Sequence, residues 1–558
     1  MSLDLDPSIL EKRKNALSRY ISNPDGNFFV LMDLGVSGIA GAAYARYSRA
    51  KGSFRETFVK EFLDNDGNIK TSKLEVLERI LLEFGDESVG ELEGAHSSWE
   101  RISNLATKKI EDKRIGGSPI EQSSRYVVYD MTDEKGDWFY LREPRIMESR
   151  FASKYLETMD FLFSKYVSLV KNMRTYFEAI NPLNEFKTKM RVNNEDLEVK
   201  LHDLSTEQQI RDFKTIYNFV MKTSACDRAR VILPAATLTN VGIFGNGRFY
   251  KNLLKSLYSD DLSEMQKIAD KQHQELNKVI EVYVRGAKRD EYLVNTRKNM
   301  EKLSKEILND VDKWDSKDDV ILEDYDHKNI EDYIIAQCLF KFAEHPIEQL
   351  RHIVKNLPQE KKEEIFNTYI GERRDKRDRP GRALENGYPL SFEVVSDFGV
   401  YRDLHRHRML TQERQNLTVH LGYTIPNEIQ EAGWEDDVKE CYSKSGELYS
   451  KLVEDYPEEA QYATLFGHKI RYFMGMNFRE AMHMWELRTI PQGHPNYRKI
   501  CQKMHTLTME KYPLLGGSMK FVNYNQYVHA RAGSESRITI KLQELRDKYN
   551  KDIDRSDS

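Results

Sequence analysis

The segment Leu404–Leu417, LHRHRMLTQERQNL, places two guanidinium groups on either side of one imidazole, at Arg406, His407 and Arg408. Arginine side chains match the geometry of phosphate and carboxylate groups in a bidentate way, so this cluster suits a phosphorylated ligand. A solvated helix end is the alternative, because cations interact favourably with the helix dipole there. A metal site at His405 and His407 is disfavoured, since the adjacent arginines repel a cation.

The chain as a whole does not have the charge of a nucleic-acid-binding protein. Its 558 residues include 85 Lys and Arg against 90 Asp and Glu, for a formal net charge of −5. Nucleic-acid-binding domains are usually basic, so an anionic ligand would have to be held by a local cluster. The four cysteines lack metal or disulfide spacing. With no signal peptide and no apolar run of membrane-spanning length, we expect a cytoplasmic protein without a membrane partner.

Helical patterns separated by short β-like segments predict an α+β fold that is rich in helices. The β-like pattern is clearest at Ser123–Asp130, after a Gly-Gly-Ser-Pro turn. The helical patterns cover Ala40–Gly52, Lys73–Glu93, Ser263–Asp290, Ile334–Leu357 and Glu458–Leu487. Acidic residues crowd the middle of the chain, at Lys305–Tyr333, and indicate an exposed connector between two halves.

Two features recur in the same order in both halves. The first is a helix that ends in a basic cluster, Asp112–Arg114 in one half and Arg406–Arg408 in the other. The second is Asn-x-Arg, at Asn246–Arg248 and Asn477–Arg479. Such recurrence is consistent with an internal duplication.

Three further stretches carry candidate ligand-binding side chains. In an extended Gly116–Asp130, the side chains of Glu121, Ser123 and Arg125 would share one face, where they could bind a nucleotide or form a satisfied surface ladder. Arg230, in CDRARVILP, can reach a ligand or pair with a carboxylate. Asn477 and Arg488 can line one groove, or form the polar edge of a core helix.

Together these stretches resemble the flavin-dependent thymidylate synthases, the ThyX type. That family carries RHR, Glu-x-Ser-x-Arg-Tyr, R-x-x-LP, Asn-x-Arg and Leu-Arg. The first half keeps EQSSRY, at Glu121–Tyr126, and Arg230, whereas the second half keeps RHR and Leu487-Arg488. Where the family has Glu-x-Ser-x-Arg, the second half has Arg414, Asn416 and Thr418.

The resemblance implies two such α/β domains in tandem, each retaining what the other has lost. The expected boundaries are 1–290 for the first domain, 291–333 for the charged connector, 334–540 for the second domain and 541–558 for a polar tail. An extra helical insertion is expected at about 136–209. Since the family is a homotetramer with shared sites, a homodimer would form a pseudo-tetramer with composite sites.

The implied reaction is the reductive methylation of dUMP to dTMP, with FAD as cofactor and NADPH and methylenetetrahydrofolate as co-substrates. The residues implied at the reaction centre are Ser123, Arg406 and Arg488, with Ser123 not acting as a nucleophile. Those implied in substrate binding are Glu121, Gln122, Ser123, Ser124, Arg125, Arg230, Arg406 and Arg488. Those implied in FAD binding are Arg406, His407, Arg408, Asn246, Arg248, Asn477 and Arg479, and no metal is implied.

The sequence also departs from the family pattern. The histidines of an upstream His-Glu-x-Pro-x-Glu-His motif are missing, and Asp403 stands where a nucleotide-contacting Gln is expected. The alternative function is therefore a catalytically degenerate relative that binds a nucleotide or flavin, or serves as a scaffold.

Overall fold

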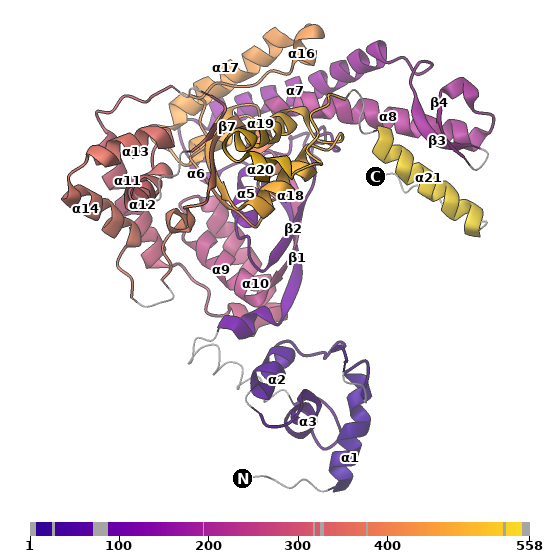
Figure 1. The fold of residues 1–558 in the computed structure, drawn as a ribbon, viewed down its shortest axis with the longest axis vertical. Coiled ribbons are helices and arrows are strands. Elements are labelled where there is room, and N and C mark those ends of the chain that lie inside the picture. The colour runs from indigo at the N-terminus through magenta and orange to yellow at the C-terminus, as the bar shows by residue number, and fades with distance from the viewer. Residues whose placement is uncertain are drawn as a thin grey trace. The chain divides into compact units, whose positions relative to one another are not determined.

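The computed structural model describes residues 7–24, 28–48, 50–70, 87–192, 195–315, 318–323, 329–374, 378–527 and 532–549. Helices predominate and strands form small sheets, which confirms the α+β expectation (Figure 1). No helix in this part of the chain is long and apolar enough to cross a bilayer. The chain divides into two compact units: residues 1–100, 109–121 and 240–294 form one, and residues 101–108, 122–239 and 295–558 the other.

The first unit contains an N-terminal group of short helices and most of one sheet. The sheet has the strand order β1-β5-β2, and β2 pairs antiparallel with β5 so that Glu121 lies opposite Val241. The elements are α1 (Pro7–Ala16), α2 (Ile39–Tyr47), α3 (Phe54–Thr57), β1 (Gly94–Ser103), β2 (Gly117–Glu121), β5 (Leu238–Asn246), α9 (Gly247–Tyr258) and α10 (Ser263–Val284).

The second unit is built around a four-stranded sheet of order β6-β7-β9-β8. Its strands are β6 (Val320–Leu322), β7 (Leu390–Asp397), β8 (Thr411–Arg414) and β9 (Lys469–Met476). All eight residues of β7 are buried, so both faces of this strand are covered. Phe473 of β9 packs into an apolar core with side chains of α11 (Glu291–Leu308), α12 (Ile330–Phe340), α13 (Ile347–Asn356) and α14 (Gln359–Ile370).

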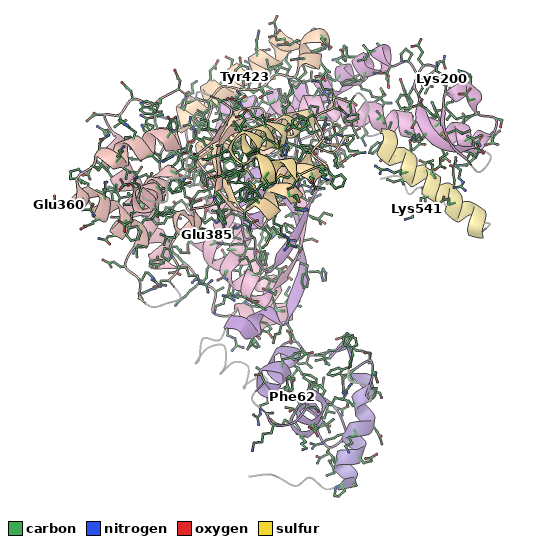
Figure 2. The ribbon with its side chains drawn as sticks, viewed as in Figure 1. Phe62, Lys200, Glu360, Glu385, Tyr423 and Lys541 are labelled. Atoms are coloured by element: carbon green, nitrogen blue, oxygen red, sulfur yellow. The ribbon has the colours of Figure 1, made fainter. Side chains whose placement is uncertain are left out.

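The remaining elements of the second unit are helices and one hairpin. They are α5 (Asn104–Glu111), which begins in this unit, α6 (Pro144–Met147), α7 (Ala152–Ile180), β3 (Thr188–Val192), β4 (Glu195–Val199), α8 (Glu207–Ala229), α15 (Phe398–Leu404), α16 (Asn427–Glu431), α17 (Glu435–Leu452), α18 (Phe478–Arg488), α19 (Pro495–Lys511), α20 (Pro513–Gly517) and α21 (Ala532–Tyr549). The hairpin β3–β4 packs against α21; Figure 2 labels Lys200, just after the hairpin, and Lys541 on α21.

The same succession of elements occurs twice along the chain. In the first half it is β1-α5-β2, then β5-α9-α10; in the second half it is β7-α15-β8, then β9-α18-α19. The strand orders β1-β5-β2 and β7-β9-β8 match as well. The N-caps also correspond: Ser103 accepts from Ala106 N and Asp397 from Val400 N, each three residues on.

Backbone hydrogen bonds place the two successions in register. Asn104 N donates to Thr237 O, and its counterpart Phe398 N donates to His468 O. Asn104 and Thr237 are 133 positions apart, whereas Phe398 and His468 are 70 positions apart. The first half therefore has 63 more residues between the two bonded positions. That surplus falls where the helical insertion is expected, and the structure has α7 and the β3–β4 hairpin there.

One pair of bonds joins equivalent positions of the two halves. Ala235 N donates to Thr464 O at 2.7 Å, and Phe466 N donates to Leu233 O at 2.8 Å. Ala235 and Phe466 are 231 positions apart, and so are Leu233 and Thr464. Each bond is therefore the counterpart of the other, with the two halves exchanged. The bridge between Pro234 and Leu465 lies between them and is its own counterpart. Contacts that interchange in this way have the pattern of an isologous, two-fold contact around Pro234 and Leu465.

Several expectations from the sequence are wrong in detail. Ser123–Asp130 is not a strand. The strand β2 ends at Glu121 and the chain then turns, so the alternation of side chains that predicted a strand does not extend past Glu121. The predicted helix Glu458–Leu487 contains the strand β9, whose apolar residues are buried on both faces and therefore show no period of two.

Other expected segments are only partly helical or partly described. The segment expected as a helical insertion, residues 136–209, contains the hairpin β3–β4 besides α7, and α11 lies within the stretch expected as a connector. The predicted helix Lys73–Glu93 lies largely outside the described residues, as do residues 550–558 of the expected tail.

Candidate functional site

Short turns from strands into helices position the second half's cluster. Asp397, the last residue of β7, caps α15 by accepting from Val400 N at 2.8 Å. All seven residues of α15 are buried, so Arg402 and Asp403 are carried into the interior of the unit. The basic segment His405–Arg408 follows directly. His407 is buried, whereas the side chains of Arg406 and Arg408 are exposed.

Arg125, from the first half, lies against residues of the second half within the second unit. Its Nε is 3.0 Å from Asp227 Oδ1, and its Nη1 donates to the Tyr497 hydroxyl at 3.2 Å. Its Nη2 donates to the Gln492 carbonyl at 3.3 Å. Burial alone would lower the pKa of Arg125, but the charge of Asp227, assisted by Tyr497 and Asp403, raises it well above its ordinary value. Arg125 is therefore a fixed cation.

Arg230 is the second buried arginine, and it pairs with Asp403. The Nη2 of Arg230 lies 3.2 Å from Asp403 Oδ2, and the two side chains are 4% and 11% exposed. Burial would raise the pKa of Asp403, yet the charges of Arg230, Arg125 and Arg406 lower it well below its ordinary range. Asp403 is thus an ionised carboxylate at the place where the resemblance leads us to expect a Gln.

The serines beside Arg125 make further contacts. Ser124 Oγ accepts from Arg402 Nη1 at 3.3 Å. Ser123 Oγ accepts from the backbone N of Arg125 at 3.3 Å, which shapes the turn that follows β2. Gln122 precedes this turn, and Glu121 is buried at the end of β2 in the first unit. The turn brings the Ser123–Arg125 segment to α15.

His407 connects the basic segment to α18. Its Nδ1 is 2.8 Å from Glu480 Oε1, and its Nε2 accepts from Arg488 Nε at 2.9 Å. Burial lowers the pKa of His407; Glu480 opposes this effect and Arg488 adds to it. Arg488 also lies over the ring of Tyr497, 5.9 Å from its centroid.

The Asn-x-Arg motifs have a structural function in both halves. Asn246 accepts from Phe249 N at 2.8 Å and caps α9, while Asn477 accepts from Glu480 N at 3.0 Å and caps α18. Arg248, in the first unit, pairs with Glu91, and Arg479 is exposed. The structure brings the motif residues Ser123, Ser124, Arg125, Arg230, His407 and Arg488, together with Arg402 and Asp403, into one connected set.

Three members of the connected set were not singled out from the sequence: Asp227, Glu480 and Tyr497. Asp227 lies three positions before Arg230, near the end of α8, and Glu480 directly follows Asn-x-Arg. Asp227 and Glu480 are acidic residues next to motifs with a predicted arginine. A search for carboxylates near those arginines in the sequence would have found both. Nothing in the sequence marks Tyr497. The described residues contain no group of His, Cys, Asp and Glu suited to a metal ion.

The equivalent position in the other half is filled differently. The β2–β5 and β8–β9 registers align Glu121 with Arg414, because they lie opposite Val241 and Tyr472, which are 231 positions apart. Arg125 then corresponds to Thr418, and Arg230 to Gln461. Gln461 Oε1 accepts from Leu417 N at 3.1 Å, and its Nε2 donates to Glu458. Neither Arg125 nor Arg230 has a basic counterpart in the other half.

The fold and the connected set define an α+β protein with two sheets of like order and a buried arginine cluster. A family model described as thymidylate synthase complementing protein matches residues 38–281 and 333–514. Since these matches cover more than half of the chain, the chain belongs to that family.

Curated relatives share almost the whole length of the chain. A UPF0159 protein of Chlamydia muridarum is 34% identical over 547 residues, covering 94% of this chain and 98% of the relative. A UPF0159 protein of Chlamydia pneumoniae is also 34% identical, over 548 residues, with 94% and 97% coverage. One from Thermoplasma acidophilum is 29% identical over 508 residues, with 90% and 98% coverage.

Proposed function

We propose that the protein is a flavin-dependent thymidylate synthase that methylates dUMP to dTMP, at a composite site made by the two halves of one chain. The observation that carries this proposal is the set of contacts in the second unit: Arg125 bonds to Tyr497, and Ser124 to Arg402. Motif segments that are each incomplete in one half are adjacent in the fold. Family membership supports the reaction class.

The arginines fit the ligand chemistry that this reaction requires. Arg125 and Arg230 are the cations best placed to hold the phosphate of dUMP, because their guanidiniums are pre-oriented by Asp227 and Asp403. Within the described residues, the terminal nitrogens of Arg488 make no hydrogen bond. This guanidinium can stabilise negative charge that develops on the pyrimidine ring as C5 becomes nucleophilic.

The donor set near the basic segment partly fits FAD. Arg406, Arg408 and Arg479 are exposed guanidiniums from two neighbouring elements, and such groups suit a pyrophosphate. Four other predicted flavin-binding residues also have roles within the fold: Asn246 and Asn477 cap helices, both ring nitrogens of His407 contact side chains, and Arg248 pairs with Glu91. When bound, the flavin supplies hydride to complete the methyl group, with NADPH and methylenetetrahydrofolate as co-substrates.

The internal two-fold relation supports two further parts of the proposal. Its interchanging bonds at Ala235 and Phe466 support a tandem duplication of one α/β domain. Two chains would then form a homodimer equivalent to the family's tetramer. The protein would act in the cytoplasm on small molecules, with no nucleic-acid partner.

A second candidate function is a catalytically degenerate nucleotide- or flavin-binding protein. The observation that favours it is that the ionised carboxylate of Asp403 already forms an ion pair with Arg230. A phosphate bound there would lie beside a negative charge.

Complementation of a thymidine auxotroph separates the two functions. We expect the wild-type gene to restore growth without thymidine, and Arg125→Ala and Arg406→Ala to abolish rescue. A matched control is Arg150→Ala, an exposed arginine paired with Asp455, which should rescue fully. Rescue by Arg406→Ala would contradict the composite site. Failure of the wild type, with the protein expressed and colourless after incubation with FAD, would favour the degenerate relative.

A further inference from the structure

We propose that Glu480 is a positioning residue, which orients Arg488 toward the ligand by fixing the tautomer of His407. The consequence for the ligand rests on the proposed function, in which Arg488 contacts the pyrimidine. The tautomer itself follows from contacts on α18 and after α15, and does not depend on that function.

The three side chains form one chain of contacts, in which Glu480 and His407 are buried and Arg488 is half-buried. Glu480 lies in the first turn of α18, fixed by the Asn477 cap, and is 7% exposed. Its Oε1 is 2.8 Å from Nδ1 of His407, which is 5% exposed. On the other side of the ring, Nε2 is 2.9 Å from Arg488 Nε. Residues two turns apart on α18 are thereby joined through a side chain from another segment.

The partners of the two ring nitrogens, Arg488 and Glu480, decide the tautomer of His407 together. The Nε–H of an arginine side chain can only donate, so His407 Nε2 must accept from Arg488. The ring proton of a neutral His407 is then on Nδ1, where the Glu480 carboxylate accepts it. Without that carboxylate, the proton can move to Nε2 and would point at Arg488. Glu480 therefore controls whether Arg488 keeps its acceptor.

The groups that face His407 favour the neutral ring. Burial lowers its pKa, and the charges of Arg488 and His483 act in the same direction, while Glu480 acts against them. The ring of His483 lies 5.6 Å from that of His407, centroid to centroid. A neutral ring at pH 7 keeps Nε2 available as an acceptor.

This arrangement differs from the way in which the other two arginines are held. Arg125 and Arg230 each pair directly with a carboxylate, which orients the guanidinium but offsets its charge. Arg488 is oriented by a neutral ring, and the carboxylate lies one residue further away. The positive charge of the Arg488 guanidinium is therefore offset less by a neighbouring carboxylate. A guanidinium in that state can stabilise a negative charge that develops on a ligand.

The first test is nitrogen NMR of the protein with ¹⁵N-labelled histidine. We expect His407, assigned by its loss in His407→Gln, to carry its proton on Nδ1 in the wild type. In Glu480→Ala we expect a mixture of tautomers. The control is Glu486→Ala on the same helix, since that carboxylate accepts from Phe521 N instead and should leave the signal unchanged. An unchanged His407 signal in folded Glu480→Ala overturns the proposal.

The second test is a double-mutant cycle in dUMP binding, by calorimetry. A hydrogen bond to a charged group corresponds to about a tenfold change in Kd, so Glu480→Ala should weaken binding roughly tenfold. If Glu480 acts through Arg488, the double variant with Arg488→Ala should bind no more weakly than Arg488→Ala alone. Additive losses overturn the proposal. A wild type that does not bind dUMP contradicts the proposed function, whereas the NMR result still decides the tautomer.

Discussion

Asp403 is the residue at which this chain departs most sharply from the family pattern, and its pairing gives a pH-dependent prediction. Asp403→Asn leaves Arg230 as a buried cation without its ion pair, so the free energy of unfolding at pH 7 should fall by about 3 kcal/mol. The folded-state pKa of Asp403 is lowered, so the stabilisation is present above the ordinary Asp pKa and is lost as the pH falls below about 4. Urea denaturation at pH 7 and pH 3 measures both effects.

The matched control for this prediction is Asp455→Asn, which removes a carboxylate from an exposed pair with Arg150. Exposed pairs contribute about 0–1 kcal/mol, so this variant should be almost as stable as the wild type at both pH values. Equal destabilisation by Asp403→Asn at pH 7 and pH 3 would show that the ion pair is not its cause.

At the scale of elements, the β3–β4 hairpin depends on a helix that lies more than 300 residues later in the sequence. Thr188 Oγ1 and Ser536 Oγ are 2.6 Å apart, and Arg191 pairs with Glu544 at 2.6 Å. An isolated two-stranded hairpin is only marginally stable in water. We therefore expect the docking of α21 to keep β3 and β4 folded.

Deletion of residues 532–558 tests this dependence. We expect amide hydrogen exchange at 188–199 to become at least tenfold faster, because the hairpin loses its cover. The strands β7 and β9, which are buried in the sheet of the second unit, serve as the internal control and should exchange at the wild-type rate. Unchanged protection of the hairpin would mean that α7 and α8 suffice to hold it.

For the molecule as a whole, the two-fold relation predicts a binding stoichiometry. One position has Arg125 and Arg230, whereas the corresponding position has Thr418 and Gln461, whose polar atoms bond within the protein. We therefore expect calorimetry to show about one dUMP per chain, and Arg125→Ala to abolish binding. A stoichiometry of two per chain, or loss of only half of the sites in Arg125→Ala, would show that the second position also binds.

The α+β class, and the family through its divided motifs, could be predicted from the sequence. Strands buried on both faces could not be recognised by pattern: the apolar residues of β9 do not alternate with polar ones, so its sequence reads equally as a helix. The paired carboxylates were missed for a different reason. Asp227 is adjacent to Arg125 only because α8 and the turn after β2 meet in space, and no local spacing records that contact.

The sequence by itself determined which chemical groups each half retains, because motif residues are fixed by identity and order. It determined, for example, that Arg125 and Arg230 come from one half and Arg406 and Arg488 from the other. Only the tertiary structure decided that the retained groups meet within one chain, because the contacts from Ser124 to Arg402 and from Arg125 to Tyr497 span hundreds of residues. Such contacts depend on the packing of distant segments within the second unit, and they leave no periodic signal in the sequence.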